Sequence, residues 1–96
     1  MARLSDEDVQ EIIEVLEEQL YSVPQLNKIE KMRMKTKIRH QAGWLTTVLN
    51  PTPKRVFDKM KSKMSDVFML FPYGFNDTFQ EFLDEKLKNL KATPSS

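Results

Sequence analysis

The sequence predicts an all-α protein, built as a small antiparallel bundle of about four amphipathic helices. Apolar residues recur at helical spacing in four segments, and Pro24, Pro51 and Pro72 fall between those segments. Each apolar stripe needs a partner to bury it, so we expect the four segments to share one core. A chain of 96 residues suits one domain, predicted over residues 1–91, with residues 92–96 as a flexible C-terminal tail.

The first helix is predicted over residues 6–22. Ser5 suits the N-cap position because Asp8 follows three residues later, close to the pattern of a capping box. The helix is expected to end before Pro24, since a residue that precedes proline disfavours helical geometry. Its apolar face is formed by Val9, Ile12, Ile13, Leu16, Leu20 and Val23.

The second segment carries two competing patterns. Residues 31–39 alternate strictly between polar and apolar side chains, which indicates a half-buried strand, and residues 41–43 would then form a turn. The alternative fold is therefore α+β, with a hairpin at residues 31–49. We favour a helix because Lys, Arg, Met and Gln are good helix formers and no strong turn pair is present. The helical face would consist of Met34, Ile38, Ala42, Leu45 and Leu49.

The third helix is predicted over residues 53–70. Thr52 is a candidate N-cap, and Pro53 suits the first helical position because its missing N–H would have no helical partner there. The expected apolar face comprises Phe57, Met60, Met64, Val67, Phe68 and Phe71.

The fourth helix is predicted to follow a turn at residues 72–74. Its cap is expected at Asn76 or Asp77, since both side chains can accept a hydrogen bond from the first turn. The expected apolar face comprises Phe79, Phe82, Leu83, Leu87 and Leu90.

Charge is unevenly distributed along the chain, although the net charge is only +1. Residues 1–23 carry a net charge of −6, residues 24–65 a net charge of +9, and residues 66–96 a net charge of −2. Either the acidic first helix packs beside the basic segments and neutralises them, or the basic segments face an acidic partner or a polyanion. The sequence leaves both interpretations open.

A nucleic-acid-binding domain that uses residues 28–63 is the alternative function. Cationic side chains at helical spacing would form rows that contact phosphates, although the chain carries no helix-turn-helix, RRM, KH or zinc-finger motif. The candidate polyanion-binding residues are Lys28, Lys31, Arg33, Lys35, Arg39, Lys54, Arg55, Lys59, Lys61 and Lys63.

Residues that would support catalysis are scarce. The chain has no cysteine and one histidine, His40, with no acidic residue at a spacing that links it to a site. Gly43 and Gly74 are too far apart to form a phosphate-binding loop. We therefore expect no enzyme activity, catalytic residue, metal, cofactor or small-molecule substrate.

The sequence shows neither a membrane-spanning segment nor a secretory signal. The longest apolar run, residues 67–71, is far shorter than the roughly 20 residues that a membrane-spanning helix needs. The N-terminal residues lack the basic start and apolar core of a secretory signal. We expect an intracellular protein, cytoplasmic or nuclear, for which a membrane role is unlikely.

Four aromatic residues are candidate partner-binding residues: Trp44, Phe71, Tyr73 and Phe75. Three of them stand within one short stretch, residues 71–75, which either covers the end of the bundle or anchors a partner. The favoured function is therefore a non-enzymatic protein–protein interaction module, acting as an adaptor, scaffold or dimerisation domain. Its partner would be another protein or a second copy of the chain.

Thr52 is a candidate phosphorylation site. The sequence Thr52-Pro53-Lys54-Arg55 matches the pattern of proline-directed kinases, and a phosphate at a helix N-terminus would meet free amides and nearby cations. A plain Thr-Pro helix start is the alternative interpretation.

Overall fold

Helices account for the regular structure of residues 3–92, the part of the chain that the computed structural model describes, with side chains through residue 88. The elements are α1 (Asp6–Tyr21), α2 (Lys28–Gly43), the 3₁₀ turn η1 (Trp44–Thr47), α3 (Pro53–Lys63), α4 (Ser65–Phe68) and α5 (Phe75–Ala92). The all-α prediction is confirmed. The alternative hairpin at residues 31–49 is wrong, because α2 and η1 occupy that segment and no strand occurs in the described residues.

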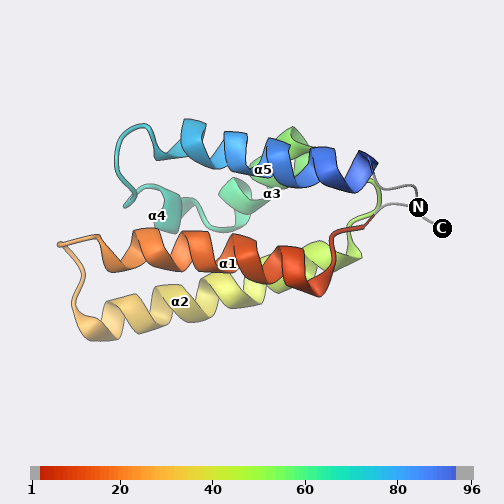
Figure 1. Ribbon diagram of the computed structural model, residues 1–96. Coiled ribbons are helices and arrows are strands. Elements are labelled where there is room, and N and C mark those ends of the chain that lie inside the picture. The colour runs from red at the N-terminus through yellow and green to blue at the C-terminus, as the bar shows by residue number, and fades with distance from the viewer. Residues whose placement is uncertain (1–2, 93–96) are drawn as a thin grey trace.

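The helices form an elongated antiparallel bundle of 46 × 24 × 19 Å. α1 lies between α2 on one side and α5 on the other, with α3 behind α5 and the short α4 beside the far end of α1 (Figure 1). Ion pairs agree with this order, because α1 contacts α2 through Glu17–Arg39 and α5 through Glu11–Lys86. α2 is therefore an outer helix with one long face open.

Side-chain caps explain where the helices begin. Ser5 and Asp8 form the predicted capping box at the start of α1, and Thr52 accepts a hydrogen bond from the Arg55 amide at the start of α3. A second capping box, not predicted from the sequence, begins α2: Asn27 Oδ1 accepts from the Glu30 amide at 2.8 Å, and Glu30 Oε1 accepts from the Asn27 amide at 3.2 Å.

The predicted apolar faces meet in one core. α1 buries all of its expected stripe, whereas α2 buries only Ile38 and Ala42 and places Met34 at the edge of the core. Leu49 is 41% exposed because the chain leaves the helix at η1, which turns it out of the predicted face. Since the N-terminal half of α2 contributes so little to the core, its exposed side chains are available for other contacts.

The predicted helix over residues 53–70 is divided at Met64. Met64 has φ −128° and ψ 39°, so α3 ends at Lys63 and α4 runs in a new direction. The bend brings the Phe68 ring against Phe57, at 5.8 Å between centroids, and against Phe79, at 5.9 Å. Packing of this aromatic cluster overrides an apolar pattern that would fit one continuous helix.

α5 begins at Phe75, earlier than the predicted cap at Asn76 or Asp77. Gly74 has φ +88°, which only glycine adopts readily, and this turn lets the buried Phe75 ring pack 4.6 Å from the Phe71 ring. Residues 93–96 of the predicted tail, and the side chain of Leu90, lie outside the description. No helix in the described part of the chain is long and apolar enough to cross a membrane.

Candidate interaction site

A groove runs along α2 where this helix faces the end of α1. Its volume is about 680 Å³, and four of its lining residues belong to the predicted polyanion-binding set, namely Lys28, Lys31, Lys35 and Arg39. The remaining lining residues are Tyr21, Met32 and Thr36. We call this surface, made of these seven residues, the α2 groove.

The α2 groove combines positive charge with exposed apolar side chains. Tyr21 is 59% exposed and Met32 is 70% exposed, and Ile29, which adjoins Lys28 on α2, is 65% exposed. Lys28 and Lys31 have no carboxylate within ion-pair distance among residues 3–88. The groove therefore offers both apolar contact and uncompensated charge to a ligand.

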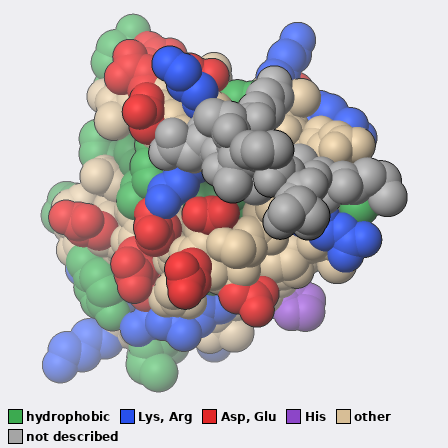
Figure 2. Space-filling view, turned by 45° about the vertical axis from the view of Figure 1, so that its right-hand side comes forward, with side chains coloured by type: hydrophobic (Ala, Val, Ile, Leu, Met, Phe, Trp, Pro, Cys, Tyr) green, Lys and Arg blue, Asp and Glu red, His purple; other side chains and the backbone are tan. Residues whose placement is uncertain are grey.

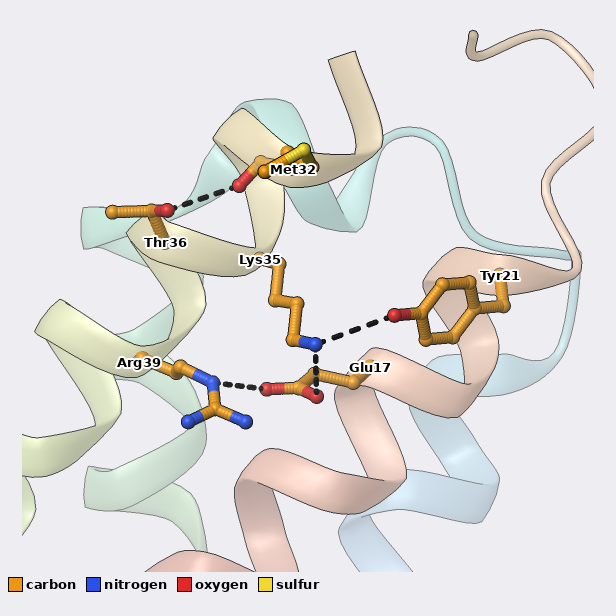
Figure 3. A network of polar contacts seen from close by, with 6 residues as sticks. All are labelled: Glu17, Tyr21, Met32, Lys35, Thr36 and Arg39. Atoms are coloured by element: carbon orange, nitrogen blue, oxygen red, sulfur yellow. Dashed lines mark hydrogen bonds and ion pairs between the residues drawn. The ribbon is translucent and has the colours of Figure 1, made fainter. Parts of the chain in front are cut away.

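A polar network fixes one wall of the α2 groove (Figure 3). The Glu17 carboxylate on α1 accepts a hydrogen bond from Arg39 Nε at 2.8 Å and lies 3.8 Å from Lys35 Nζ. Lys35 also donates to the Tyr21 hydroxyl at 3.3 Å, and Lys31 donates to the Tyr21 backbone carbonyl at 3.2 Å. Because Lys35 and Arg39 share one buried carboxylate, their positions are determined before any ligand binds.

The acidic first helix neutralises the basic segments only in part. Its Glu17 pairs with α2, but Asp8 and Glu11 pair with Lys86 of α5 instead. Acidic side chains gather at the level of α1, and Lys and Arg side chains gather below them at the level of α2 (Figure 2). The interpretation in which α1 neutralises the basic segments is therefore supported only for Lys35 and Arg39, which share Glu17.

The predicted cations of α3 separate onto two sides of the helix. Lys54 lines a groove with acidic residues of α3 and α5, and Lys61 lies over the Phe57 ring at 5.8 Å. Arg55 and Lys59 line a small pocket beside Trp44. Lys63 is exposed one turn beyond Lys59, and Arg33 is exposed on α2 outside the α2 groove.

The four aromatic candidates do not form one surface. Phe71 and Phe75 are buried in the core and pack on each other, which removes both from the predicted partner-binding set. This is a correction: the Phe71 and Phe75 rings belong to the core of the bundle, because leaving them in water would be costly. Tyr73 is fully exposed, and Trp44 is 44% exposed.

The sequence-based reasoning missed Tyr21, Met32 and Glu17. Tyr21 and Met32 are apolar residues that lie outside the predicted apolar faces of their helices. This position could have indicated that their side chains are exposed. Glu17 resembled its solvated acidic neighbours, because only the packing of α2 against α1 buries it.

Metal-binding side chains do not converge in the described residues. No group of three His, Asp or Glu side chains there could hold a metal ion, and His40 is exposed near the end of α2. Thr52 is half-buried, and its hydroxyl oxygen accepts the capping hydrogen bond from Arg55 at 3.3 Å. Comparison with protein-family models found no match, and comparisons with curated proteins and with solved structures found none either.

Proposed function

We propose that this protein is a non-enzymatic interaction module whose α2 groove binds an acidic, amphipathic segment of another protein. The observation that supports the proposal is the combination, in one groove, of four cations with the exposed side chains of Tyr21 and Met32. A purely apolar ligand would not need the row of cations, and a ligand that offers phosphates alone would not need the exposed apolar side chains. A peptide that carries both acidic and apolar side chains matches both features.

The spacing of the cations indicates the length of the segment. Lys28, Lys31, Lys35 and Arg39 extend over three turns of α2, which corresponds to about 16 Å along the helix axis. An acidic helix of about 11 residues would span the same length. Its apolar side chains would contact Tyr21 and Met32, while its carboxylates would pair with the lysines.

The test begins with selection from a display library of random peptides about 16 residues long. Peptides retained by the immobilised protein are expected to be enriched in Asp and Glu together with large apolar residues. Enrichment without an acidic bias, or no enrichment, would contradict the proposal.

Variants then locate the binding surface. Lys28→Glu and Met32→Gln are expected to weaken a selected peptide about tenfold each, which is 1.4 kcal/mol. Arg33→Glu is the matched control, because it makes the same charge change on the same helix outside the α2 groove. Equal weakening by Lys28→Glu and Arg33→Glu would show that the attraction is not specific to the groove.

A second copy of the chain is the competing occupant, since residues 1–23 carry a net charge of −6. Light scattering of the free protein distinguishes this case. We expect a monomer for all variants. A dimer that Lys28→Glu dissociates would place a second copy in the groove and overturn the proposal of a separate partner.

A further inference from the structure

A second basic surface, separate from the α2 groove, lies where η1 meets α3. It consists of Trp44, Arg55, Lys59 and Lys63, and we call it the Trp44 surface. Trp44, Arg55 and Lys59 line one pocket, and Lys59 Nζ lies 5.0 Å from the centre of the Trp44 ring. Arg55, Lys59 and Lys63 recur every four residues, so they follow one side of α3.

Charge on the Trp44 surface is uncompensated. None of Arg55, Lys59 and Lys63 has a carboxylate within ion-pair distance in the part of the chain with described side chains. On α2, by contrast, three cations pair with acidic residues, namely Lys35, Lys37 and Arg39. A ligand that neutralises Arg55, Lys59 and Lys63 would therefore carry several negative charges spaced along its length.

Shape favours a flat ligand group over an inserted side chain. The pocket beside Trp44 has a volume of about 70 Å³. This is room for about two water molecules. Leu45 and Val56 at its base are each 1% exposed, so Trp44 is the most exposed apolar side chain of the lining. The surface thus presents a ring edge and face beside cations rather than a hydrophobic cleft for a helix.

We propose that the Trp44 surface binds single-stranded nucleic acid, with a base stacked on Trp44 or on the Arg55 guanidinium and phosphates on Lys59 and Lys63. Aromatic and guanidinium planes next to a basic row are the groups that single strands use, because unpaired bases expose their faces while the backbone carries regular charge. A duplex hides its base faces, so it would gain only the charge. This site and its ligand are independent of the α2 groove.

Trp44 itself reports the binding, because it is the only tryptophan in the chain. Titration with an oligothymidylate of about 12 nucleotides is expected to quench the Trp44 emission at low salt. The logarithm of the binding constant should fall with the logarithm of salt concentration at a slope of about −1.4, as expected for the two phosphate contacts of a single strand with Lys59 and Lys63. Absence of quenching at low salt would overturn the proposal.

Paired charge reversals separate this site from general attraction. Arg55→Glu combined with Lys59→Glu is expected to abolish quenching, whereas Lys54→Glu combined with Lys61→Glu makes the same charge change on the other side of α3 and should retain it. Trp44→Ala, followed by anisotropy of a labelled oligonucleotide, should weaken binding by a factor of about 5 to 150. Circular dichroism of each variant establishes that it is folded.

Three further outcomes would contradict the proposal. Equal losses in both double variants would mean that binding reflects the diffuse positive charge of residues 24–65. Quenching by polyglutamate as strong as that by the oligothymidylate would assign the Trp44 surface to an acidic protein. A duplex of the same length that quenches Trp44 as strongly would exclude base stacking as the source of the signal.

Discussion

Glu17 is buried although it is charged, with an exposed fraction of 8%. Its carboxylate lies between Arg39 and Lys35, both of which remain in contact with water, so the pair is desolvated mainly on one side. We expect Glu17→Gln to lower the free energy of unfolding by about 1–2 kcal/mol, because a charge-assisted hydrogen bond is replaced by a weaker one. Urea denaturation measures this loss.

Glu18 provides the control for Glu17, because it is the adjacent acidic residue of α1 and is exposed. No cation lies within ion-pair distance of Glu18 in the described structure. Glu18→Gln should change the free energy of unfolding by less than about 0.5 kcal/mol. Similar losses for the two variants would show that Glu17 acts only through the general charge of α1.

Single residues also mark the limit of what the sequence predicts about the candidate site. The cationic row of the α2 groove was predictable, because helical period alone brings Lys28, Lys31, Lys35 and Arg39 together. The burial of Phe71 and Phe75 was not predictable, since the same aromatic stretch suits a core or an interface. The choice between core and interface depends on where the other aromatic rings lie in the folded protein.

The capping box of α2 matters more than its counterpart on α1. The N-terminal half of α2 buries little apolar surface, so the Asn27–Glu30 hydrogen bonds replace packing as its source of order. Asn27→Ala is expected to cost about 1 kcal/mol and to speed amide hydrogen exchange in the first turns of α2, while α1 stays protected. Asn27→Asp keeps the acceptor and should behave like the wild type; uniform acceleration in both helices would contradict this view.

Helix boundaries divide into those that local sequence determines and those that packing determines. Ser5 and Thr52 accept hydrogen bonds from nearby amides, and Pro53 fixes its own φ at a helical value, so the starts of α1 and α3 could be predicted. The bend at Met64 could not, because its cause is the contact of Phe68 with rings of α3 and α5. Such contacts join residues that are distant in the sequence and leave the local apolar period unchanged.

At the scale of the whole molecule, ion pairs between oppositely charged segments connect its two halves. Lys37 of α2 donates two hydrogen bonds to Asp66 of α4, at 2.9 and 2.8 Å, and so joins the α1–α2 pair to the remaining helices. On the other side, Lys86 of α5 joins the acidic residues of α1. The basic and acidic segments are therefore partly self-complementary. Among residues 3–88, the α2 groove and the Trp44 surface each keep cations that have no ion pair, as do Arg33, Lys54 and Lys61 elsewhere on α2 and α3.

The Lys37–Asp66 contact makes stability depend on pH. The hydrogen bonds from Lys37, together with its charge, lower the pKa of Asp66 below its ordinary value. A carboxyl group with a lowered pKa stabilises the folded state fully above the unfolded-state pKa of about 3.9 and loses that contribution as the pH falls through the folded-state pKa. Because both side chains are substantially exposed, the contribution is at most about 1 kcal/mol.

Asp66→Asn therefore should destabilise the protein at about pH 7 and approach the wild-type stability as the pH falls through the lowered pKa of Asp66. Denaturation across this pH range, with and without added salt, measures the difference, and salt should reduce it at neutral pH. Asp58→Asn is the matched control, since Asp58 is exposed and has no ion pair in the described residues. A difference between wild type and Asp66→Asn that stays constant with pH would mean that the two halves are joined by apolar packing alone.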